Sequence, residues 1–78
     1  MLALFHLVNN MLRDRRVLIE AEIFKLKQEC GEEYLNMVTS PQRWSPYNQE
    51  QYDAKLTKLT NLQTEFSVIT HMINNGAK

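Results

Sequence analysis

Two prolines, Pro41 and Pro46, stand five residues apart near the middle of this 78-residue chain, and no other proline interrupts it. Proline lacks a backbone donor and clashes with the preceding helical turn, so neither residue fits inside a continuous helix. On both sides of this break, apolar residues recur at steps of three or four, which is the spacing of one helical face. The pattern predicts two long amphipathic helices, over about residues 3–38 and 46–74, joined by a short connection.

The apolar stripes of the two predicted helices are long enough to pair along most of their length. The first stripe consists of Phe5, Val8, Leu12, Ile19, Ile23, Leu26, Cys30, Tyr34 and Met37, and the second of Tyr52, Leu56, Leu59, Leu62, Phe66, Ile69 and Ile73. A short connector between long helices favours an antiparallel arrangement, which places Ile19 near Phe66 and Leu26 near Leu59. The predicted fold is therefore all-α, an antiparallel two-helix hairpin that forms a single domain over residues 1–78.

The chemistry around the break predicts where the second helix begins. The hydroxyl of Ser45 can accept a hydrogen bond from an orphan amide, and Pro46 at the first helical position has no donor to waste. Ser40 and Pro41 repeat this signal and predict one short turn before the second helix. At the far end, residues 74–76 read Asn-Asn-Gly and supply a residue able to close a helix in the left-handed conformation.

Gly31 is the weak point of the first helix, because an interior glycine costs about 1 kcal/mol relative to alanine. Met37 and Val38 continue the apolar pattern beyond it, which favours a helix that runs to about residue 38. A helix that ends near residue 30 is the alternative.

Composition excludes several classes of function. The chain is 44% apolar and carries nine basic and nine acidic side chains, so no basic surface predicts binding to nucleic acid. No apolar stretch approaches the roughly 18 residues needed to span a bilayer, so we expect no membrane association. The single cysteine, Cys30, cannot form an internal disulfide, which favours a reducing cytoplasm.

No pattern in the chain predicts catalysis or a cofactor. His6 and His71 lack companions at metal-ligand spacing, so no metal site is expected. Cys30 has no adjacent base and is expected to be a buried, inert thiol. The carboxylates lie mainly between apolar positions, as on a solvated helix face, and a two-helix hairpin is not expected to form a concave pocket. The chain is therefore predicted not to be an enzyme.

The apolar arc is wider than one partner helix can cover, so a homodimer or another partner must complete the fold. Beyond the paired stripes, the first helix carries further apolar residues such as Val17, and the second helix does the same. The expected partner-binding residues are Leu4, Leu7, Met11, Leu18, Phe24, Val68 and Met72. An amphipathic helix laid into a groove is a common way to use such a surface. Self-association into a four-helix bundle would cover the same residues.

A family resemblance sharpens this expectation. Gln51 and Tyr52, then Leu56 and Leu59, then the run from Phe66 to Ile73 (FSVITHMI) with its short polar tail, resemble the C-terminal helix of small co-chaperones of bacterial type III secretion needle subunits. The resemblance covers residues 51–78, whereas residues 1–45 agree only in pattern. The family is similar in length, in its two-helix hairpin form and in lacking catalytic motifs.

The resemblance implies a non-enzymatic virulence-associated role. Such a co-chaperone binds a helical, tetratricopeptide-like chaperone in the bacterial cytoplasm, and the pair keeps the needle subunit soluble before export. Two alternatives stay open on sequence alone. One is a needle-type subunit itself, which is another short chain with two helices around a proline-bearing turn. The other is a self-associating structural helical-bundle protein.

Overall fold

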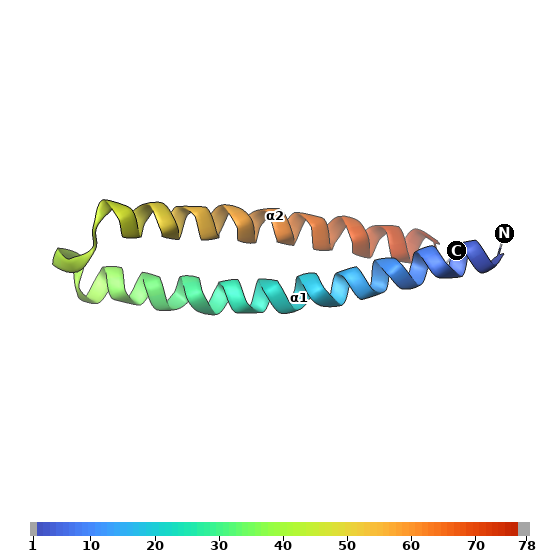
Figure 1. Ribbon diagram of the computed structural model, residues 1–78, viewed down its shortest axis with the longest axis horizontal. Coiled ribbons are helices and arrows are strands. Elements are labelled where there is room, and N and C mark those ends of the chain that lie inside the picture. Colours follow the sequence, from blue (N-terminus) through green and yellow to red (C-terminus); the bar gives the residue numbers. More distant parts are fainter. Residues whose placement is uncertain (1, 77–78) are drawn as a thin grey trace.

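The computed structural model describes the backbone of residues 2–76 and the side chains of residues 7–75. Helix α1 spans Leu2–Thr39, a 3-10 turn η1 spans Pro41–Arg43, and helix α2 spans Pro46–Gly76. The two helices run antiparallel and side by side, and the start of α1 projects past the end of α2 (Figure 1). The molecule is a thin rod with extents of 60 × 16 × 15 Å. The predicted all-α hairpin is confirmed.

The connector is built as its sequence predicts. The short turn predicted at Ser40 and Pro41 is the 3-10 turn η1. The hydroxyl of Ser45 accepts a hydrogen bond of 3.1 Å from the backbone amide of Asn48. This bond satisfies one of the orphan donors at the start of α2, so Ser45 is the N-terminal cap.

Both helices extend further than the sequence predicts. Helix α1 continues through Gly31 to Thr39, so the alternative in which it ends near residue 30 is wrong. Helix α2 includes Gly76, and no glycine of the described backbone has a positive φ. The left-handed closure expected at residues 74–76 is therefore not found there. The apolar pattern on both sides of Gly31 explains its inclusion, because packing of a helical face outweighs a single unfavourable propensity.

We expect Gly31→Ala to stabilise the hairpin. A Cβ atom added at Gly31 would meet nothing within 4 Å, so the change brings no clash. Alanine also removes the conformational freedom that glycine has in the unfolded chain, and the expected gain is about 1 kcal/mol. Thermal unfolding of the variant at low protein concentration measures this gain. A lower midpoint than wild type would show that Gly31 serves another purpose in the folded chain.

The core is a single row of side chains between the helices. Its buried apolar residues are Ile19, Leu26, Leu62, Ile69 and Ile73, and Leu12, Ile23, Leu59 and Phe66 pack against them half-buried. Every one of these residues belongs to the two stripes predicted from sequence. The core therefore lies toward the end of the hairpin where the chain begins and ends, rather than at the connector.

Three predicted stripe residues are exposed instead. Val8, Tyr34 and Leu56 are 47%, 52% and 37% exposed, so their assignment to the seam is wrong. Near the connector, the seam positions next to Tyr34 and Leu56 are occupied by Glu33 and Lys55, whose Oε1 and Nζ atoms lie 2.6 Å apart. A coiled-coil seam advances 3.5 residues per turn, and this spacing places Glu33 and Lys55 between the helices. Their apolar neighbours consequently face outward.

Two ion pairs follow one edge of the seam, between this layer and the chain termini. The guanidinium of Arg15 contacts the Glu65 carboxylate at 3.0 Å. The ammonium of Lys58 lies 2.9 Å from the Glu22 carboxylate. The carboxylates of α1 were predicted to lie mainly on a solvated face, and Glu22 is 43% exposed although it pairs across the hairpin, whereas Glu33 is only 25% exposed. The hydrogen bond from Lys58 lowers the pKa of Glu22, and the hydrogen bond to Glu65 raises the pKa of Arg15. Such exposed pairs add little stability, but they favour one alignment of the helices.

Candidate partner-binding surfaces

Three of the expected partner-binding residues form an exposed apolar row on α1. Leu7, Met11 and Leu18 are 57%, 61% and 64% exposed. They lie at positions i, i+4 and i+11 of one helix, which places them on the same face. The row spans about 16 Å along the helix axis, at 1.5 Å per residue. It is long enough to contact a three-turn helix.

Two further expected residues lie on α2 beside this row. Val68 and Met72 are 52% and 49% exposed and stand one helical turn apart. The ion pair between Arg15 and Glu65 links the two helices here. Arg15 is four residues after Met11, and Glu65 is three residues before Val68, so all of these side chains share one side of the hairpin. We call the surface formed by Leu7, Met11, Leu18, Val68 and Met72 the terminal flank.

The remaining two expected residues do not join the terminal flank. Phe24 is 64% exposed but lies six positions from Leu18, about one third of a turn away around α1. The side chain of Leu4 lies outside the described residues. The sequence expectation of one docking face is therefore resolved into two surfaces. The prediction from sequence did not separate the two surfaces, because it treated all the apolar residues outside the paired stripes as one binding surface.

Phe24 instead belongs to a second exposed surface along the back of α1. This surface is formed by Val17, Phe24, Leu35 and Val38, which are 57–64% exposed, and we call it the outer face. Val17 and Phe24 each stand two positions before a core residue, a rotation of about 200° that directs them away from α2. The sequence analysis did not assign Leu35 and Val38 to any binding surface. The recurrence of apolar residues at 17, 24 and 38 was the signal that could have found them.

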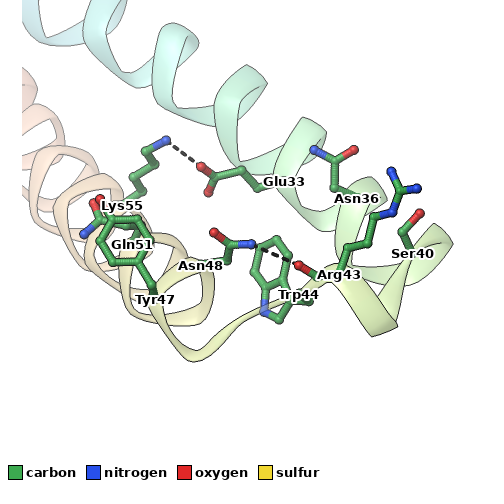
Figure 2. Close-up of a pocket in the computed structure, with 9 residues that line it drawn as sticks. All are labelled: Glu33, Asn36, Ser40, Arg43, Trp44, Tyr47, Asn48, Gln51 and Lys55. Carbon is green, nitrogen blue, oxygen red and sulfur yellow. Dashed lines mark hydrogen bonds and ion pairs between the residues drawn. The ribbon is translucent and has the colours of Figure 1, made fainter.

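A polar recess lies at the connector end of the hairpin (Figure 2). It has a volume of about 480 Å³ and is lined by Glu33, Asn36, Ser40, Arg43, Trp44, Tyr47, Asn48, Gln51 and Lys55. The expectation that two helices cannot form a concave site is wrong at this point. The connector forms part of the recess. Arg43 of η1 and Trp44 directly after it line the recess between the end of α1 and the start of α2.

Two hydrogen bonds join residues that line the recess, from Lys55 to Glu33 and from the Asn48 side chain to the Arg43 carbonyl. Lys55 donates a 2.6 Å hydrogen bond to Glu33, which raises the pKa of Lys55 and keeps it protonated. The indole nitrogen of Trp44 donates to the Gln49 side chain at 2.9 Å. The ring of Trp44 also meets the ring of Tyr52 edge-on, with centroids 6.0 Å apart. Trp44 therefore folds back on the start of α2 and caps the connector end of the hairpin.

The isolated reactive groups have ordinary structural surroundings. Cys30 is buried, and burial raises the pKa of its thiol, which disfavours the reactive thiolate. This agrees with the expected inert thiol. His71 is exposed, and its Nε2 atom lies 2.7 Å from the Asn75 side chain, one turn further along α2. Within the described part of the chain, no three histidine, cysteine, aspartate or glutamate side chains gather as a metal site would require.

Neither helix, over the residues that the structure describes, has an apolar stretch long enough to cross a membrane. Comparisons with protein-family models, with curated proteins and with solved structures found no match. Among the described residues, the terminal flank and the outer face together contain nine of the thirteen exposed large hydrophobic side chains.

Proposed function

We propose that this protein is a non-enzymatic co-chaperone that docks a helical partner on its terminal flank. The observation that supports the proposal is the group of five apolar side chains, each about half exposed or more, on one side of a two-helix hairpin. Exposed apolar surface of this kind on a small protein usually marks an interaction site. Covering it would remove apolar area from water at about 25 cal/mol per Å².

The charges of the terminal flank suit an apolar helix rather than a strongly charged ligand. Arg15 and Glu65 neutralise each other at 3.0 Å, and Glu22 and Lys58 do so at 2.9 Å. The flank therefore presents an apolar row on each helix with the neutral Arg15–Glu65 pair between them, and the exposed Asp14 stands within the α1 row, one turn from Met11 and from Leu18. A partner helix laid over this pair would contact both rows at once, in the manner of a helix bound in a groove.

The sequence resemblance supplies the identity that we propose for the partner. Val68 and Met72 belong to the run from Phe66 to Ile73 that resembles the co-chaperones of type III secretion needle subunits, and both are exposed on the terminal flank. We therefore propose a tetratricopeptide-like chaperone as the direct partner, in the bacterial cytoplasm. Through it the chain would help to keep a needle subunit soluble before export.

Co-expression with the tetratricopeptide-like chaperone and the needle subunit of the same genome tests this function. We expect a discrete complex in size-exclusion chromatography with light scattering, in which the needle subunit stays monomeric. Met72→Glu and Leu18→Glu place a charge in the apolar contact, and each should weaken capture about 100-fold or more. Circular dichroism should show that both variants remain helical, because both positions are exposed.

Leu35→Glu is the matched control for this experiment. Leu35 is 60% exposed, like Leu18, but it lies on the outer face. The variant should capture the chaperone as well as wild type does. Unchanged capture by both Met72→Glu and Leu18→Glu would exclude the terminal flank as the docking site. Open-ended fibres formed by the chain alone would identify it as a needle-type subunit instead.

A further inference from the structure

The outer face of α1 continues as a regular seven-residue repeat. Val17, Ala21, Phe24, Gln28, Leu35 and Val38 follow steps of four and three, with Gly31 in the one position between Gln28 and Leu35. Steps of four and three over three repeats match the spacing of a coiled-coil seam, in which Val17, Phe24, Leu35 and Val38 are large apolar residues, Ala21 and Gly31 are small, and Gln28 is polar. The core of the hairpin uses other residues, Ile19 and Leu26 among them. Helix α1 thus carries two seams, and α2 covers only one of them.

Gly31 lies in this second seam with open space around it. Nothing lies within 4 Å of a Cβ atom built at Gly31, so packing inside the hairpin does not require glycine there. In a pair of helices, a residue without a side chain lets the two backbones approach closely. At its place on the outer face, Gly31 would allow a second helix to approach the α1 backbone closely.

The charged residues beside the outer face favour a parallel pair of α1 helices. In the repeat, Glu20 and Lys27 border the seam on one edge, and Lys25 and Glu32 border it on the other. In a parallel pair in register, each residue of the first edge faces the residue five positions later in the second copy. Glu20 then faces Lys25 of the second copy, and Lys27 faces Glu32 of the second copy. The two-fold axis repeats both pairs, and every facing pair has opposite charge.

An antiparallel pair places fewer of these four residues opposite a residue of opposite charge. With Phe24 packed against Leu35 of the second copy, Lys25 faces Glu32, but Lys27 faces Tyr34 and Glu20 has no basic residue opposite it. Shifting that arrangement by one repeat brings Lys25 against Lys25 and Lys27 against Lys27, which is repulsive. Within the described side chains, none of these four charged residues belongs to an ion pair of the hairpin itself.

We propose that the outer face of α1 binds a second copy of this chain, as a parallel, in-register coiled coil over residues 17–38. The resulting dimer has four helices in a row, with the two α1 helices in the middle and an α2 helix at each side. This contact spans about 33 Å at 1.5 Å per residue. Leu18 borders the contact, but the other four residues of the terminal flank, Leu7, Met11, Val68 and Met72, stay uncovered, so the dimer does not depend on the co-chaperone function.

Sedimentation equilibrium of the purified chain over a range of concentrations tests the dimer. Wild type should show a concentration-dependent monomer-dimer equilibrium. Leu35→Glu places two like charges in the seam and should raise the dissociation constant about 100-fold or more. Met72→Glu, on the terminal flank, should dimerise as wild type does. A wild-type chain that stays monomeric up to roughly 0.5 mM would overturn the proposal.

A charge exchange tests the parallel orientation. Lys25→Glu sets like charges opposite each other at Glu20 in both pairs and should raise the dissociation constant about tenfold. Adding Glu20→Lys to this variant restores opposite charges in the parallel pair and should return the dissociation constant toward the wild-type value. In the antiparallel pair the double variant still sets residue 25 against Glu32 with like charge. Failure of the double variant to recover would therefore exclude parallel pairing.

Disulfide capture gives an independent readout of orientation. In a Cys30→Ala background, Val38→Cys should cross-link two copies on mild oxidation, because equivalent seam positions of a parallel pair lie within the roughly 4.4–6.8 Å between Cα atoms that a disulfide needs. Met72→Cys in the same background should not cross-link. Absence of the Val38→Cys dimer, with a dimer from Ala21→Cys and Val38→Cys together, would show antiparallel pairing and overturn the proposed orientation.

Discussion

Replacing Ile19 with alanine is expected to unfold most of the chain at 25 °C. Ile19 is 1% exposed and lies in the single row of core side chains between the helices. Truncating a buried isoleucine to alanine costs about 2–5 kcal/mol, because the removed methyl groups lose their burial and leave a cavity. A core of this size rarely supplies more than about 3–5 kcal/mol in total. The loss is therefore comparable with the whole stability of the hairpin.

Leu18→Ala is the matched control for that prediction. Leu18 is the preceding residue and also a large aliphatic side chain, but it is 64% exposed. Its truncation should change the free energy of unfolding by no more than about 0.5 kcal/mol. Urea titration followed by circular dichroism, at low protein concentration, compares the two variants. Equal stabilities would show that the seam between α1 and α2 does not hold the chain together.

The second large expected effect is a gain in stability, and it comes from replacing the ion pair of Glu33 and Lys55 near the connector. Changing Glu33 and Lys55 together to leucine should raise the thermal unfolding midpoint by about 5–10 °C, because apolar side chains fill a seam position better than a partly desolvated ion pair does. Lys55→Leu alone should lower the midpoint. It leaves the Glu33 carboxylate against the seam, where its Oε2 atom is buried without a hydrogen-bond partner.

The pH dependence of the same variants checks the role of Lys55. The hydrogen bond to Glu33 raises the pKa of Lys55 above the ordinary 10.5, so folding favours the protonated form. The stability that this pair contributes is complete below pH 10.5 and is lost as the pH rises through the raised pKa. Wild type should therefore lose more stability than the double leucine variant between pH 10 and pH 12. Parallel losses in the two proteins would show that the pair contributes nothing.

The charged layer also bears on specificity, because a polar pair in an apolar seam aligns the two helices. Lys55 meets only Glu33 and Glu29, at 2.6 Å and 3.9 Å, in the described structure. We infer that the layer lowers stability but fixes the alignment that keeps the terminal flank assembled from both helices.

Proline placement and apolar spacing were enough to predict the elements and the core of this protein. The Pro41 and Pro46 break fixed where the chain turns, and the apolar spacing identified every residue of the buried core, because helix geometry is local and repeats along the chain. The same spacing identified the exposed apolar residues only as one wide arc. It misplaced Tyr34 and Leu56, which it assigned to the seam.

Only the tertiary structure decided how that arc divides. The orientation of α1 against α2 depends on contacts between residues far apart in the chain, such as Arg15 with Glu65 and Glu33 with Lys55. Those contacts set the rotation of each helix about its axis, and a difference of one residue in the seam turns a side chain by about 100°. That rotation brought Leu18 of α1 and Met72 of α2 to one flank of the hairpin. Periodicity within α1 separates Leu18 from Phe24, but it does not show which residues of α2 lie beside each of them.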